Sequence, residues 1–182
     1  MFRKANRIKR GFTLLELMAA FLVMAIVAGV AIPTYREYII RGRMTEVVTV
    51  LNVYLDVAKQ QYVSYGTIPT TINGVPARTA TAITTSPCIS HIYYDDGVGT
   101  PWANVGKGAM VQAIINDECG KGIPGYTAGV AGAFNRITVA FKASGELLTY
   151  YCGTWLNDGS QVPLSYLPSG CQNNAFKTLV TG

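Results

Sequence analysis

An uninterrupted apolar stretch near the N-terminus most constrains how this chain can fold. Residues 11–35 read GFTLLELMAAFLVMAIVAGVAIPTY, with a single carboxylate, Glu16, and a single proline, Pro33. As a helix rising 1.5 Å per residue, residues 12–32 would extend roughly 31 Å, about the thickness of the hydrocarbon core of a bilayer. The segment is therefore long enough to span a membrane.

A basic segment precedes the apolar stretch, and its side chains are Arg3, Lys4, Arg7, Lys9 and Arg10. Positive charge on this flank keeps the N-terminus cytoplasmic and directs the rest of the chain outward. A signal peptide or a plain anchor shares this feature, but a signal peptide carries a small-residue cleavage site after its apolar run, and no convincing site follows Ile32. A lone carboxylate inside the run, Glu16, costs roughly 2–3 kcal/mol on insertion scales, and less near the interface. We therefore expect Glu16 to have a specific role.

The basic leader, the sequence GFTLLE and the apolar run together resemble the N-terminus of type IV pilins and their pseudopilin relatives. The resemblance implies that a membrane-embedded prepilin peptidase cleaves between Gly11 and Phe12 and methylates the new amine of Phe12. The leader, 1–11, would be removed. The helix over 12–35 would anchor the subunit in the inner membrane and later pack in the core of a filament.

Two residues of this helix are candidate assembly residues. A buried carboxylate needs a cation, and the resemblance offers the amine of Phe12 on the same or a neighbouring subunit, so we hypothesise that Glu16 sets subunit stagger or recruitment. The alternative is a charge that extends to the lipid headgroups. Pro33 removes a helical hydrogen bond, so a kink or loosened stretch is expected between Gly29 and Pro33. The resemblance implies a bending point in filaments, whereas a proline simply tolerated in lipid is the alternative.

Beyond Pro33 the pattern becomes amphipathic, which predicts that the helix continues to about residue 65 and ends at Gly66 and Pro69. From Phe12 to Tyr65 such a helix would be about 81 Å long. Its apolar stripe should form the core against a sheet. The stripe consists of Ile40, Met44, Val47, Val48, Leu51, Leu55, Ala58 and Tyr62.

Residues 36–182 are expected to form a globular domain. The order of its predicted elements indicates an α+β fold, with the helix packed on a C-terminal antiparallel sheet of three or four strands. Residues 66–108, rich in Thr, Gly, Pro, Ser and Ala, are expected to form a long variable loop. Strands are predicted over 110–115, 136–141 and 146–151, with a hairpin at 142–145. A weakly marked fourth strand is placed near 162–167 or 177–180.

Four cysteines occur, and an even number in a domain outside the inner membrane predicts disulfides. Spacing cannot choose among the three possible pairings. Sequential pairing, Cys88–Cys119 and Cys152–Cys171, is the prediction. The resemblance supports the second pair, because many type IV pilins end in a disulfide-closed C-terminal loop, and it does not support the first.

No catalytic or metal-binding constellation is predicted, and no cofactor. His91 is the only histidine, which argues against histidine-based catalytic triads and metal sites. Two acidic pairs, Asp95–Asp96 and Asp117–Glu118, could be calcium ligands, but acids beside glycine are more often turns. Outside the leader the basic and acidic side chains balance, with 10 of the 15 basic residues against all 10 acidic ones. This balance leaves nucleic-acid binding unsupported by charge.

Together with the resemblance, these features predict a non-enzymatic, structural subunit of a type IV pilus, a major pilin of the IVa-like subtype. Its partners would be other copies of itself, the prepilin peptidase and the pilus assembly machinery of the inner membrane. The precursor would reside in the inner membrane and the assembled pilus outside the cell, in a Gram-negative bacterium. Adhesion, twitching motility and DNA uptake are the expected roles. A minor pilin or a type II secretion pseudopilin is the first alternative, and a DNA- or receptor-binding pilin-like module is the second.

Overall fold

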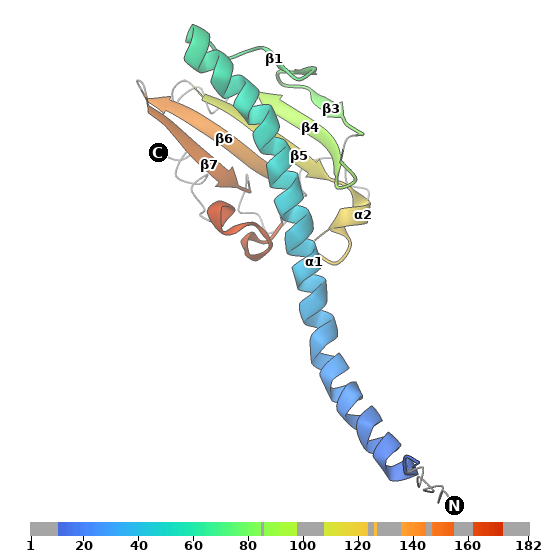
Figure 1. The fold of residues 1–182 in the computed structure, drawn as a ribbon. Coiled ribbons are helices and arrows are strands. Elements are labelled where there is room, and N and C mark those ends of the chain that lie inside the picture. The colour runs from blue at the N-terminus through green and yellow to red at the C-terminus, as the bar shows by residue number, and fades with distance from the viewer. Residues whose placement is uncertain are drawn as a thin grey trace, which may run out of the picture. The chain divides into compact units, whose positions relative to one another are not determined.

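The computed structural model describes residues 11–84, 86–97, 108–123, 126, 136–144, 147–154 and 162–172. It contains two compact units, Met1–Glu37 and Tyr38–Gly182. One long helix, a five-stranded sheet, a two-stranded sheet and short helical turns make up the described part (Figure 1).

The helix α1 runs from Leu14 to Tyr65 without interruption, and Pro33 lies inside it. Its length confirms the prediction of a single long helix. It ends at Gly66, whose backbone N–H donates to the carbonyl of Tyr62 at 2.8 Å and whose φ is +68°. Glycine suits this position because the left-handed conformation that closes a helix strains residues with a Cβ.

Within the second unit, α1 lies across one face of the sheet (Figure 1). The predicted apolar stripe is confirmed, because the side chains from Ile40 to Ala58 in it are buried and Tyr62 packs at its margin. The ring of Tyr62 lies 6.1 Å from the ring of Phe141 on the sheet. Burying each large apolar side chain contributes about 1.5–3 kcal/mol, so this stripe holds helix and sheet together.

The five-stranded sheet is antiparallel throughout, in the order β3-β4-β5-β6-β7. Its strands are β3 Ala80–Ala82, β4 Ile89–Asp95, β5 Gly108–Ile115, β6 Arg136–Ser144 and β7 Leu147–Gly153. The central strand, β5, is buried along its whole length. In the β6–β7 hairpin Phe141 pairs with Tyr150 and Ala143 with Leu148, which places these four residues on one face of the sheet.

The α+β class and the antiparallel sheet are confirmed, but the expectation of a long loop over 66–108 needs correction. Its described part contains β3, β4 and a separate hairpin of β1 Thr71–Ile72 and β2 Val75–Pro76. A register shift between Ile89 and His91 breaks the alternation of β4, which hid this strand from a period-two search. The hairpin turns at Asn73-Gly74, with φ values of +44° and +78°. This dipeptide is a strong hairpin signal that the composition of the segment obscured.

The weakly marked fourth strand near 162–167 is also wrong, because Leu164–Tyr166 form a short 3₁₀ helix, η2. Pro163 directly precedes it and Pro168 directly precedes the next turn, η3 Ser169–Cys171. Proline lacks the N–H that a strand ladder requires, so this segment cannot pair regularly. The alternative position, 177–180, lies outside the described residues.

One buried hydroxyl yields a prediction about stability. Tyr94 is fully buried in the core, and its hydroxyl donates to the carbonyl of Pro69 at 2.6 Å. Tyr94→Phe leaves that carbonyl without its donor, so we expect the free energy of unfolding to fall by about 1–3 kcal/mol in urea titrations. A loss below a few tenths of a kcal/mol would contradict this role for the bond.

The same residue gives stability a pH dependence. Burial, followed by the charges of Asp96 and Asp95, raises the pKa of Tyr94 well above its ordinary value of 10. The contribution of Tyr94 to the free energy of unfolding is therefore complete below about pH 10. It is lost as the pH rises further, because Tyr94 ionises at a lower pH in the unfolded chain than in the folded one. The free energy of unfolding, measured by urea titration, should fall less between pH 8 and pH 11 for Tyr94→Phe than for the unsubstituted chain.

Candidate assembly site

The N-terminal end of α1 is closed by a side-chain cap. Gly11, Phe12 and Thr13 precede the helix, and Thr13 Oγ1 accepts the backbone N–H of Glu16 at 3.2 Å. The backbone N–H of Leu17 donates to the carbonyl of Thr13 at 3.2 Å. Thr13 is therefore the N-cap, and Glu16 stands at the third helical position. The pattern T-x-x-E is that of a capping box, a signal in the sequence that we did not use.

Glu16 lies exposed in the first turn of α1. The partial positive charge at the start of a helix favours a carboxylate there. Phe12 is also exposed, at 86% of its surface, and lies just before the cap. A chain that began at Phe12 would therefore carry its amine within about one helical turn of Glu16. Both groups are open to another chain, so the arrangement suits a charge pair within or between subunits.

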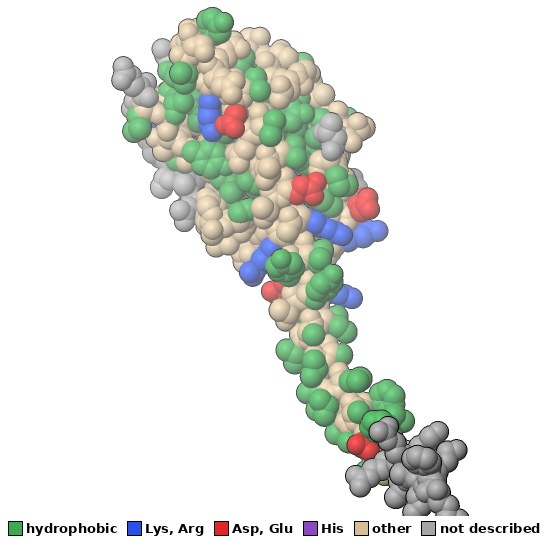
Figure 2. Space-filling view, in the orientation of Figure 1, with side chains coloured by type: hydrophobic (Ala, Val, Ile, Leu, Met, Phe, Trp, Pro, Cys, Tyr) green, Lys and Arg blue, Asp and Glu red, His purple; other side chains and the backbone are tan. Residues whose placement is uncertain are grey.

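The apolar part of α1 is unburied. Its best window of 18 residues has a mean hydropathy of 2.5, and none of that window is buried by the chain. Hydrophobic side chains cover this part of the helix (Figure 2). By length and composition the helix can cross a membrane. Exposing apolar surface to water costs roughly 25 cal/mol per Å², so this part of the helix requires lipid or other apolar helices around it.

Pro33 lies inside α1 with no helix break at its position. Proline has no backbone N–H, so the carbonyl of Gly29, one turn earlier, has no helical donor. A Cβ at Gly29 would meet nothing within 4 Å, so space around that carbonyl is open. These residues form a weak point in the hydrogen bonding of the helix.

Both disulfides lie within the domain, and they pair the four cysteines in sequential order. Cys88 before β4 bonds to Cys119 in the short helix α2 Asp117–Gly120, and Cys152 in β7 bonds to Cys171 in η3. Asn116 caps α2 by accepting the backbone N–H of Cys119 at 3.0 Å, and its amide donates to the carbonyl of Pro87. The first disulfide therefore closes a corner that is also held by hydrogen bonds.

Three of the four acidic side chains in the two pairs, Asp95, Asp96 and Asp117, have partners within the chain. Asp96 forms an ion pair with Arg78 at 3.1 Å, and Asp95 accepts the backbone N–H of Gly97 at 2.8 Å. Asp117 accepts the hydroxyl of Tyr126, and burial together with this contact raises the pKa of Tyr126 to about 12. Within the described ranges no group of three or more His, Cys, Asp or Glu side chains is arranged to hold a metal ion.

The one histidine, His91, lies in β4 opposite Ile114. The notable features of the described molecule are therefore an unburied apolar helix with a capped start and a disulfide-linked α+β domain. Together they define a class of α+β domains carried by a long N-terminal apolar helix.

Comparisons with known proteins give this class a family. Residues 6–32 match the family model for the prokaryotic N-terminal methylation motif. Fimbrial protein EcpC of Eikenella corrodens is 24% identical over 95% of this chain and 97% of its own length. Type IV major pilin protein PilE1 of Neisseria gonorrhoeae is 21% identical over 93% of this chain and 97% of its own length. The chain is therefore similar over almost its whole length to type IV pilins and fimbrial proteins.

Proposed function

We propose that this chain is the precursor of a structural subunit that polymerises into a type IV pilus. Prepilin peptidase cleaves it between Gly11 and Phe12 and methylates the amine of Phe12. The observation that carries the proposal is the order of features at the N-terminus. A basic leader and Gly11 stand directly before a capped helix whose apolar surface is unburied, and the same region matches the methylation motif.

The apolar helix has two successive environments in this proposal. The precursor and the processed subunit are anchored in the inner membrane, and the assembly machinery then transfers the helix into a filament outside the cell. Both environments bury the same surface, so the transfer loses little hydrophobic stabilisation. The names of the relatives, from Eikenella and Neisseria, support a fimbrial role and a Gram-negative host. Adhesion, twitching motility and DNA uptake are the roles that such a filament would serve.

The proposal is tested by the mass of the subunit recovered from sheared surface material. We expect a chain that begins at Phe12, with one additional methyl group at its N-terminus and two disulfides. Gly11→Leu places a bulky side chain at the cleaved bond and should leave the full-length precursor in the membrane. A surface protein that begins at Met1 without modification would refute the proposal.

Abundance separates a major subunit from a minor pilin or a pseudopilin. A major subunit should be the dominant protein of sheared filaments. The similarity to major pilins over almost the whole chain favours the major subunit. If the protein is a trace component of filaments built from another subunit, the minor role is correct.

A further inference from the structure

The turn between β1 and β2 carries the single Asn-Gly dipeptide of the sequence, Asn73–Gly74. Both residues are exposed, and both have a positive φ, +44° and +78°. Asparagine and glycine tolerate this backbone conformation, which is why a two-residue hairpin turn selects them. The same choice places a side-chain amide directly before a backbone nitrogen that has little steric protection, because glycine has no Cβ.

Neither the Asn73 amide nor the Gly74 N–H is held by a hydrogen bond. The ladder of the hairpin ends at Ile72 and Val75, on either side of the turn. Within the described part of the chain, the Asn73 side chain forms no hydrogen bond, and the Gly74 N–H donates to no acceptor. The amide is therefore able to rotate toward the neighbouring nitrogen.

Asn116, a second described asparagine, is held at both ends of its amide. Its Oδ1 accepts the backbone N–H of Cys119 at 3.0 Å, and its Nδ2 donates to the carbonyl of Pro87. The residue that follows is Asp117, whose side chain shields its backbone nitrogen more than glycine would. The amide of Asn116 is therefore kept away from the nitrogen of the next residue.

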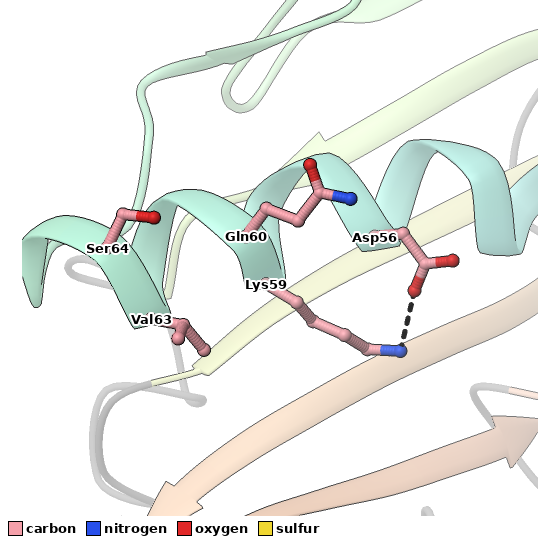
Figure 3. Close-up of a pocket in the computed structure, with 5 residues that line it drawn as sticks. All are labelled: Asp56, Lys59, Gln60, Val63 and Ser64. Atoms are coloured by element: carbon pink, nitrogen blue, oxygen red, sulfur yellow. Dashed lines mark hydrogen bonds and ion pairs between the residues drawn. The ribbon is translucent and has the colours of Figure 1, made fainter.

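Asn52, the remaining described asparagine, is held on α1. Its Oδ1 accepts the hydroxyl of Tyr150, in β7, at 2.9 Å. Lys59 Nζ lies 5.1 Å from the centre of the same ring, and its ion pair with Asp56, at 2.9 Å, lies in a pocket on the helix (Figure 3). The N–H of Val53 belongs to the helical hydrogen bonding of α1. Asn52 is therefore restrained on both sides of the bond that would react.

A dipeptide of similar sequence, Asp96–Gly97, is also restrained. Asp96 forms an ion pair with Arg78 at 3.1 Å, and the N–H of Gly97 donates to Asp95 Oδ1 at 2.8 Å. The side chain and the nitrogen of this pair are thus both engaged. Asn73–Gly74 has neither restraint, so the structure separates it from every comparable described site.

The hairpin is built so that the turn can open by itself. β1 and β2 contain two residues each and form a sheet separate from the five-stranded one. Ladders this short are marginal and open locally at low free energy. Opening allows the rotation that brings the Asn73 amide carbon to the Gly74 nitrogen, and proximity then drives an intramolecular reaction.

We propose that Asn73 is a site of spontaneous deamidation, an inference that does not depend on the proposed function. The backbone nitrogen of Gly74 attacks Cγ of Asn73, and the bond between Cγ and Nδ2 breaks. Nδ2 leaves as ammonia with the proton that the Gly74 nitrogen gives up, and a cyclic imide remains. Water then opens the ring at one of its two carbonyl carbons. The reaction exchanges no electrons with another molecule, so water is the one co-reactant.

The two products have different effects on the hairpin. Water that adds at Cγ gives aspartate, which tolerates the same turn and adds a negative charge to the surface. Water that adds at the backbone carbonyl carbon gives isoaspartate, whose main chain runs through Cγ and is one methylene longer. Ile72 and Val75 flank the turn and are 0% and 1% exposed, so a longer turn displaces packed side chains. Isoaspartate should therefore loosen the hairpin.

The first test incubates the folded, full-length chain in detergent at mildly alkaline pH and follows its peptides by mass spectrometry. Each conversion replaces an amide with a heavier acid, so the mass of the peptide reports it. We expect conversion at Asn73 to be roughly tenfold or more faster than at Asn52 and Asn116, because an amide held away from the attacking nitrogen loses the advantage of proximity.

Asn73→Gln is the matched control, because it keeps an amide but moves its carbon one methylene further from the nitrogen. The peptide of this variant should show no comparable change in mass. Equal rates at the three asparagines, or conversion at Asn73 only after the chain is unfolded in urea, would overturn the inference. Neither outcome affects the proposed cleavage at Gly11 or the assembly of filaments, which are measured on freshly prepared protein.

The second test separates the two products. Electron-transfer fragmentation distinguishes aspartate from isoaspartate in the converted peptide, and urea titration measures the stability of the aged chain. Asn73→Asp reproduces the product with the normal main chain and should unfold at the same urea concentration as the fresh, unsubstituted chain. Aged chain that contains isoaspartate should unfold at a lower concentration. Aged chain rich in isoaspartate that unfolds with the fresh chain would overturn the proposed effect on the hairpin.

Discussion

Glu16→Ala and Glu16→Gln should both abolish surface filaments while the processed subunit accumulates in the membrane. The carboxylate is the one charge within the apolar segment and lies within about one turn of the amine that cleavage at Phe12 would create. In the proposed filament core the two charges would compensate each other, whereas removal of the acid would leave an uncompensated cation, a loss of about 3–5 kcal/mol per buried contact. Sheared filament mass and membrane-retained subunit, both measured by immunoblot, give the result.

The two substitutions differ in what they preserve. Glutamine at the third helical position can complete the capping box with Thr13, but it cannot pair with a cation. If Glu16 acts only as part of the cap, Glu16→Gln should form abundant filaments and Glu16→Ala should not. If the charge is required, both should fail. Normal filaments from Glu16→Ala would contradict any role of this residue in assembly.

Loss of either disulfide should destabilise the domain by about 3–4 kcal/mol, because each bond restricts a long loop of the unfolded chain. The cysteines are separated by 31 residues in the Cys88–Cys119 bond and by 19 in Cys152–Cys171. The double variants Cys88→Ala/Cys119→Ala and Cys152→Ala/Cys171→Ala avoid a free thiol that could pair wrongly. Urea unfolding of the detergent-extracted chain measures the loss.

A comparison between the two double variants sharpens this prediction. The longer loop gives the Cys88–Cys119 bond the larger expected loss on the loop-entropy model. The corner around it keeps hydrogen bonds from Asn116 to Pro87 and to Cys119, which oppose that loss in the folded state. A destabilisation below about 1 kcal/mol for either variant would show that the neighbouring contacts hold the segment without the covalent bond.

The long helix could be predicted in detail because its signals are local. Apolar residues at spacings of three and four, and the glycine at residue 66, each act within a turn or two of the chain. The cap at Thr13 was equally visible as T-x-x-E, although we did not use it. Helical hydrogen bonds join residues four apart, so a short window of sequence contains their determinants.

The sheet was predicted only where a long segment is rich in β-branched and aromatic residues and lies between turns. The strands β5, β6 and β7 have this composition, whereas the bulge in β4 and the short lengths of β1, β2 and β3 weakened the signal. A strand also depends on a partner that can lie anywhere in the chain, so composition alone misread this region as a loop. The cysteine pairing depends in the same way on which segments meet in space.

The sequence by itself determined the N-terminal segment: the basic leader, Gly11 before Phe12, Glu16 in the apolar run and the stripe that packs on the sheet. Only the tertiary structure decided which side of α1 remains open. Thr45, Thr49 and Gly42 are unremarkable in the sequence, and the structure leaves them exposed because the sheet covers the opposite side of the helix. The physical reason is that periodicity and capping are properties of one segment, whereas an uncovered face is defined by everything that packs elsewhere.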